Sequence, residues 1–152
     1  MGEFATAVQQ RLCHALAERR AGDWETEYRV AGTPVDVAGR TDEGLVLVEL
    51  EWRRADPADN AAKLFRHLDA GELTATATVC QVFTEYYDLA TGGVSAKREN
   101  AEFVGRVAAE TFDRLSYTAV EFPLDPPKRG GEWPEDWETT TDSVAGDICA
   151  EL

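Results

Sequence analysis

The sequence predicts an α/β fold in which a mixed central sheet is flanked by helices. Apolar residues recur at helical spacing near the N-terminus, three strand-like segments follow between residues 24 and 52, and two helical segments then alternate with two further strands. Strands joined by short turns form an antiparallel meander, whereas strands separated by a helix need crossover connections. We therefore expect both kinds of strand pairing, with helices on both faces of the sheet.

The first helix is predicted over residues 3–20, where the apolar side chains form one stripe, and Gly22 is a natural stop. In the first strand the side chains alternate between two faces, and the third strand is apolar almost throughout. Asp42-Glu43-Gly44 is the turn between the second and third strands. The predicted strands span residues 24–30, 34–39 and 45–52.

Asp56 and Pro57 open the next helix as its cap and first-turn proline. A β-branched and aromatic run then predicts a central strand, and a second amphipathic helix precedes the last strand. We expect helices over residues 57–70 and 96–116, and strands over residues 74–87 and 117–124. The second of these helices should turn inward Phe103, Val104, Val107, Ala108, Phe112 and Leu115.

The composition changes after residue 124. The remaining segment is rich in acids, proline and glycine, and it contains Trp133 and Trp137, which we expect to pack it onto the body of the protein. A short helix is predicted at residues 142–151. We therefore expect one domain over residues 1–124 and a C-terminal extension over residues 125–152 that packs on the same domain.

The chain is strongly acidic, with a formal net charge of -14 over 152 residues, three lysines and one isoleucine. This mix resembles that of proteins from salt-loving archaea, in which molar salt screens the repulsion of a dense acidic surface. The alternative is an acidic protein from a GC-rich genome. The acidity counts against a nucleic-acid partner, because phosphate binding normally requires a basic patch, although molar salt weakens that argument.

No apolar run approaches the roughly 18 residues of a membrane span, and the chain starts without a signal sequence. We expect a cytoplasmic protein with no membrane partner. The three cysteines are far apart and form no CxxC pair, which argues against a disulfide framework and a cysteine-based zinc site.

Three carboxylates lie on the predicted second and third strands. Glu49 and Glu51 are two residues apart, so they share a face of the sheet. Asp36 should pair with Leu47 or with Glu49, depending on the register, and either pairing brings it within direct or diagonal reach of both glutamates. Buried carboxylates are costly without a partner, and bound Mg²⁺ or Mn²⁺ would relieve that cost because hard cations take oxygen ligands.

The pattern Pro34-Val35-Asp36 followed by Glu49-Leu50-Glu51 resembles the PD-(D/E)XK signature of restriction endonuclease-like nucleases. The resemblance covers roughly residues 3–123. It implies an α-β-β-β-α-β-α-β core and metal ligation by Asp36, Glu49 and the Leu50 carbonyl. The third motif position normally carries lysine, but here it is Glu51, which would ligate metal or act as a general base.

The resemblance further implies that Lys63, on the following helix, takes over the role of the missing lysine and neutralises charge on the phosphate. A glutamate from the first helix often completes such a site, and Glu18 is the positional candidate, with Glu27 as the other. Arg53, Arg54 and Arg66 would contact phosphates or simply balance the acidic surface.

The leading hypothesis is thus a Mg²⁺- or Mn²⁺-dependent nuclease that hydrolyses DNA and acts as a homodimer. The alternative within the same fold is a catalytically inactive binding or assembly module whose acidic surface meets a protein partner. A third hypothesis is a stress or regulatory protein unrelated to nucleic acid.

Overall fold

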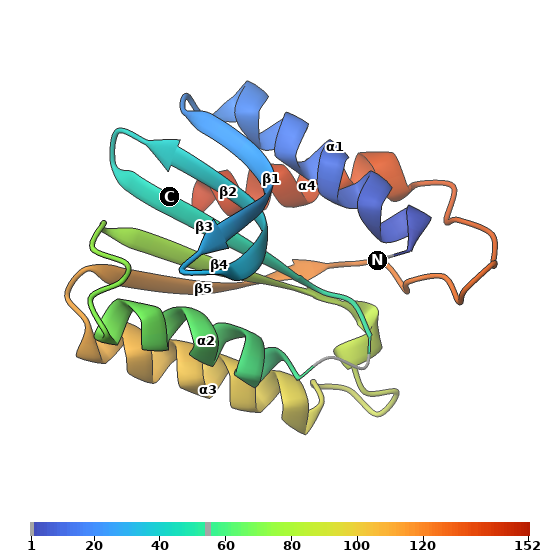
Figure 1. Cartoon of the computed structure of the whole chain (residues 1–152). Helices are drawn as coiled ribbons and strands as arrows, with labels where there is room; N and C mark the ends of the chain where they lie inside the picture. Colours follow the sequence, from blue (N-terminus) through green and yellow to red (C-terminus); the bar gives the residue numbers. More distant parts are fainter. Residues whose placement is uncertain (1, 54–55) are drawn as a thin grey trace.

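The computed structural model describes residues 2–53 and 56–152 and forms an α/β fold around a five-stranded open sheet (Figure 1). The elements, in chain order, are α1 (Glu3–Arg19), β1 (Asp23–Val30), β2 (Thr33–Thr41), β3 (Gly44–Glu51), α2 (Pro57–Asp69), β4 (Ala77–Thr84), the 3₁₀ turn η1 (Glu85–Tyr87), α3 (Ala96–Thr111), β5 (Leu115–Phe122) and α4 (Trp137–Ala150).

The sheet has the strand order β1-β2-β3-β4-β5 and is mixed, as predicted. β1, β2 and β3 pair antiparallel, and the β2–β3 turn contains only Asp42 and Glu43 between the paired residues Thr41 and Gly44. β3, β4 and β5 pair parallel because α2 and α3 carry the chain back across the sheet between them. The carboxyl ends of these three strands therefore lie at one edge of the fold.

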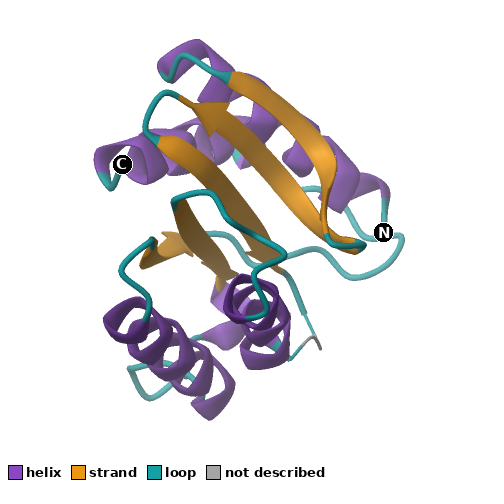
Figure 2. Ribbon diagram, turned by 60° about the vertical axis from the view of Figure 1, so that its left-hand side comes forward, coloured by secondary structure: helices purple, strands orange, loops and turns teal. Residues whose placement is uncertain are grey.

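Helices cover both faces of the sheet (Figure 2). α1 and α4 lie on one face, where fully buried side chains such as Leu12, Leu16 and Ile148 pack against Val48 and Val82. α2 and α3 lie on the opposite face and enclose a second apolar cluster. Each buried aliphatic side chain contributes about 1.5–3 kcal/mol, so these two layers hold the sheet in place.

The predicted central strand, residues 74–87, is too long at both ends. The ladder between β4 and β5 runs from Ala77 to Thr84, and the residues after Thr84 turn into η1 instead. The Glu85 amide donates to the Leu124 carbonyl, which diverts the chain away from the sheet. Strand propensity alone does not extend a strand where no neighbouring strand offers partners.

The prediction for α3 is wrong in its end and in two of the side chains expected to face inward, whereas Val104, Ala108, Phe112 and Leu115 do pack against the core. α3 ends at Thr111 rather than residue 116, and β5 starts at Leu115. Phe103 and Val107 are 56% and 41% exposed, whereas the buried face carries small residues and Arg98. A Cβ at Gly105 would overlap the Tyr117 ring, so α3 approaches the sheet through its smallest side chains rather than its largest.

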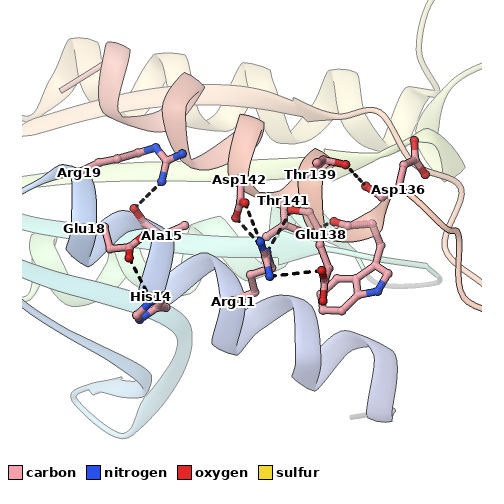
Figure 3. A network of polar contacts seen from close by, with 11 residues as sticks. Arg11, His14, Ala15, Glu18, Arg19, Asp136, Glu138, Thr139, Thr141 and Asp142 are labelled. Atoms are coloured by element: carbon pink, nitrogen blue, oxygen red, sulfur yellow. Dashed lines mark hydrogen bonds and ion pairs between the residues drawn. The ribbon is translucent and has the colours of Figure 1, made fainter.

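The C-terminal segment completes the α1 side of the core. Its helix α4 begins at Trp137, earlier than predicted, and the rings of Trp133 and Trp137 pack edge-on against Phe4 with centroids 5.3 and 5.9 Å away. Asp142 on α4 accepts two hydrogen bonds from Arg11 on α1, at 2.9 and 2.7 Å (Figure 3). Residues after 125 are therefore part of the packed fold.

Across residues 2–53 and 56–152, no helix combines the length and the apolar character needed to cross a membrane.

Candidate functional site

The β2–β3 ladder determines where Asp36 lies. Ala38 pairs with Leu47 and Val37 with Val48, so the same register places Asp36 opposite Glu49 and rules out the Leu47 alternative. The ladder stops at Val37, and Asp36 Oδ2 then accepts a hydrogen bond of 2.7 Å from the Leu50 amide. The Asp36 carboxylate thus accepts the hydrogen bond of a β3 amide at the point where β2 and β3 separate.

Asp36 is also held from the β1 side. Glu27 on β1 has a left-handed backbone with φ of 55°, which interrupts the regular alternation of that strand. Gln9 on α1 donates from Nε2 to both Glu27 Oε1 (2.9 Å) and the Asp36 carbonyl (2.6 Å). Helix α1 therefore contributes a buried glutamine, and not a glutamate, to the support of this hairpin.

The structure does not bring Glu18 to the acidic residues of the hairpin. Glu18 lies on the exposed side of α1 and forms an ion pair with His14 at 3.3 Å (Figure 3). Glu27 lies close enough for its charge to raise the pKa of Asp36, but its side chain is exposed and accepts from Gln9. Neither candidate from the sequence completes a metal site.

Asp36 and Glu49 form a coupled acidic pair. Glu49 is only 9% exposed, and burial together with the charges of Asp36 and Glu51 raises its pKa to about 9. Burial also raises the pKa of Asp36, although the Leu50 amide and a side-chain hydrogen bond with Glu49 favour its charged form. Both pKa values are raised by burial, and Glu49 is the member of the pair that holds its proton to the higher pH.

Glu51 is turned away from this pair into a buried polar network. It is 1% exposed, and its two oxygens accept hydrogen bonds from Asn60 Nδ2 (3.0 Å) and Gln81 Nε2 (2.8 Å). Gln81 also donates to the Pro57 carbonyl (2.8 Å) and accepts from the Tyr117 hydroxyl (2.7 Å). Burial raises the pKa of Glu51, and the two amide donors partly offset that rise.

A cleft of about 260 Å³ opens beside the acidic pair. Asp36 and Glu49 line one side of it, and Asn60 and Lys63 reach it from α2. Asp56 caps α2 through the Asp59 amide, as predicted, and this fixes the first turn that carries Asn60. Lys63 Nζ pairs with the exposed Asp59 at 3.0 Å, and the Lys63 side chain lines the cleft.

The residues around the cleft fit one ion held by two carboxylates. In the described part of the chain, no group of three His, Cys, Asp or Glu side chains is close enough to hold a metal. Asp36 and Glu49 remain as a pair, and Leu50 lines the same cleft. Mg²⁺ keeps several waters and is commonly bound through one or two carboxylates, so this donor set matches it. Glu51 is directed toward Asn60 and Gln81, and each of its oxygens accepts one hydrogen bond from these amides.

Arg53 and Arg66, candidates for phosphate contact or for balancing the acidic surface, do not line the cleft beside the acidic pair. Arg53 donates to Asp125 at 3.0 Å and to the Pro126 carbonyl, and its guanidinium lies 5.5 Å from the Tyr86 ring centre. Arg66 is exposed on α2, and Arg54 lies outside the described residues.

Two supporting residues were not assigned a role from the sequence. Gln81 is the one polar side chain within the Val79–Phe83 part of an apolar strand, which is a signal for a buried hydrogen-bonding role. Asn60 lies one helical turn before Lys63, on the same side of α2.

Comparison of the sequence with protein-family models and with curated proteins found no match in either set. The structural feature that suggests a function is the buried Asp36–Glu49 pair at its cleft.

Proposed function

We propose that this protein is a metal-dependent nuclease of the restriction endonuclease-like type that hydrolyses phosphodiester bonds in DNA. The observation that carries the proposal is the buried Asp36–Glu49 pair, which lies at a cleft also lined by Lys63. Two carboxylates that share one proton form a place where a divalent cation can replace that proton. The element order from α1 to β5 is the order that the resemblance implies, which supports the same reading.

The chain's own residues have separable roles in this proposal. Asp36 and Glu49 hold Mg²⁺ or Mn²⁺, with the Leu50 carbonyl as the neighbouring oxygen. The ion, when bound, lowers the pKa of water and neutralises charge on the scissile phosphate. Lys63 supplies a second positive charge at the cleft, where it stabilises the charge that develops on the phosphate oxygens.

Glu51 acts as a positioning residue in this scheme. Its hydrogen bonds with Asn60 and Gln81 connect β3 to α2 and β4, so it fixes the wall of the cleft that Asn60 and Lys63 form. Its 1% exposure and its two amide donors favour this positioning role over metal ligation or general-base chemistry.

The test is plasmid cleavage in high KCl with Mg²⁺ or Mn²⁺, together with calorimetric titration of Mn²⁺ into the metal-free protein. Asp36→Asn should abolish both the heat of binding and cleavage, because an amide cannot provide the negative charge. Glu18→Gln is the matched control, since it removes one acidic charge from an exposed position on α1. Equal cleavage by wild type and Asp36→Asn would refute the assignment.

A specific observation favours a second function. Glu51 stands where the resemblance expects lysine, and its oxygens are satisfied by amides, so the pair at the cleft lacks a third acidic or basic partner on β3. The second candidate is therefore an inactive binding module with the same fold. Mn²⁺ binding at Asp36 without any phosphodiester cleavage, on single- or double-stranded DNA, would favour this candidate over the nuclease.

A further inference from the structure

A second, larger cleft lies beyond the carboxyl end of β3. It measures about 990 Å³ and lies between the first turn of α1, the residues that follow β3, and the segment that joins β5 to α4. This joining segment passes beside the start of α1 (Figure 1). The side chains that matter for its chemistry are Phe4, Trp52, Arg53, Lys128, Arg129 and Trp133.

The charge of this cleft is opposite to that of the protein. Arg53, Lys128 and Arg129 line it, and Glu3 is the one acidic residue among its lining residues, in a chain with a net charge of -14. Lys128 is one of only three lysines. Lys128 and Arg129 are exposed, and no ion pair involving either is found within the described residues. Their charges are therefore available to an anion.

The turn that presents these cations is fixed. The Gly131 amide donates to the Lys128 carbonyl at 2.7 Å, and Gly130 adopts a φ of 75°, which residues with a Cβ rarely adopt. Lys128 and Arg129 are consecutive residues of this turn. Arg53 bonds to the same segment, through Asp125 at 3.0 Å and the Pro126 carbonyl.

Aromatic rings provide the rest of the lining. Trp133 is 41% exposed, yet its ring is held edge-on by Phe4 and Trp137, with centroids 5.3 and 5.7 Å away. A rigid ring with open surface is suited to stack with another flat ring. Two donors of lining residues, Trp52 Nε1 and Arg53 Nε, are buried and find no acceptor among the described residues. The lining thus offers positive charge together with an aromatic surface.

We propose that this cleft binds a single-stranded segment of nucleic acid, with phosphates at Lys128, Arg129 and Arg53 and a base stacked on Trp133. Proteins that bind single strands combine these two elements, a positive groove and an aromatic platform. This inference rests on the proposed nuclease function and deepens it. Trp52 follows Glu49 by three residues at the carboxyl end of β3, but it packs on the α1 side of the sheet, whereas Asp36 and Glu49 line the cleft beside α2. The two clefts therefore lie near the same end of β3 and on opposite faces of the sheet.

The experiment measures fluorescence anisotropy of a labelled thymidine oligomer of about 12 nucleotides, a length within the range of single-strand binding sites. The full chain is used with a chelator present, so that cleavage plays no part, across a series of KCl concentrations. Lys128→Ala/Arg129→Ala should weaken binding about tenfold and reduce the slope of log K against log [KCl] by about 1.4, or 0.7 for each lost phosphate contact. The charge-matched control, Lys97→Ala/Arg106→Ala on α3, should bind like wild type.

Trp133→Ala should weaken binding by about 5- to 100-fold without changing the salt slope, and Trp133→Phe should keep most of the affinity because phenylalanine preserves an aromatic face. Unchanged affinity in Lys128→Ala/Arg129→Ala, an equal loss in the α3 control, or preference for the duplex would each overturn the proposal. Asp36→Asn separates the two hypotheses, because it should bind the oligomer normally. Normal cleavage by Asp36→Asn would refute the nuclease assignment. It would not affect the proposal for the larger cleft, which the binding measurements test separately.

Discussion

Glu49 should make the stability of this protein fall as the pH rises, and Glu49→Gln should remove that dependence. The pKa of Glu49 rises from its ordinary 4.5 to about 9 in the folded chain because of burial and the nearby charges of Asp36 and Glu51. Between those two values the folded chain holds a proton that the unfolded chain releases. The contribution of Glu49 to stability is therefore complete below pH 4.5 and is lost as the pH rises toward 9.

The size of the effect follows from the shift. Each pH unit inside this window lowers the free energy of unfolding by about 1.4 kcal/mol, so the loss between about pH 5.5 and 7.5 is about 2.7 kcal/mol. For a chain of this length that corresponds to about 5–10 °C in Tm. Glutamine resembles the protonated acid in shape and can still donate to Asp36, so the variant keeps the hydrogen bond without titrating.

The assay is urea unfolding of wild type and Glu49→Gln at both pH values, in constant KCl and with a chelator present. The difference in unfolding free energy between the two proteins should change by about 2.7 kcal/mol between these conditions. Adding Mg²⁺ at the higher pH should stabilise the wild type more than the variant, because the ion replaces the proton on Glu49. Parallel pH profiles of the two proteins would refute the reasoning on the buried acidic pair.

Two further predictions concern the scaffold of the site. Tyr117→Phe should lower the free energy of unfolding by about 1–3 kcal/mol, because it leaves Gln81 Oε1 buried without its donor; urea unfolding with no measurable loss would show that this oxygen has another partner. Gly105→Ala should destabilise by about 1–3 kcal/mol because its methyl group meets the Tyr117 ring. Gly146→Ala on α4, where a Cβ meets nothing within 4 Å, should instead stabilise by about 0.5–1 kcal/mol, and thermal melts that do not separate the two variants would contradict the packing of α3.

The hairpin that carries the acidic residues could be predicted from the sequence because its signals are local. Alternation fixes which side chains share a face, and the Asp42-Glu43-Gly44 turn limits the register to two choices. The structure selects the pairing of Asp36 with Glu49, since the two-residue turn leaves Thr41 opposite Gly44. The sequence alone thus predicts that the three acidic side chains share a face of the sheet and lie near one another. Only the β2–β3 register requires the tertiary structure.

The inward face of α3 could not be predicted in this way. A helical stripe of large apolar residues usually marks the buried side, and Phe103 and Val107 belong to such a stripe. Here the large ring that fills the interface is Tyr117, on β5, and it requires Gly105 and Ala108 opposite it. How closely a helix packs on a sheet depends on the side chains of both elements. The sequence of the helix alone therefore does not determine which of its side chains are buried.

The same reasoning explains why the hydrogen-bond partners of Glu51 could not be predicted from β3 alone. Its partners Asn60 and Gln81 come from α2 and β4, and nothing within β3 distinguishes a carboxylate that meets amides from one that meets a metal. The three acidic residues differ in what offsets the energetic cost of burying their carboxyl groups. Glu51 has two amide donors, and Asp36 has the Leu50 amide, whereas Glu49 keeps a proton. Under the proposed function, Glu49 is therefore the group at which a bound cation would gain most, because the ion would displace that proton and make both carboxylates its ligands.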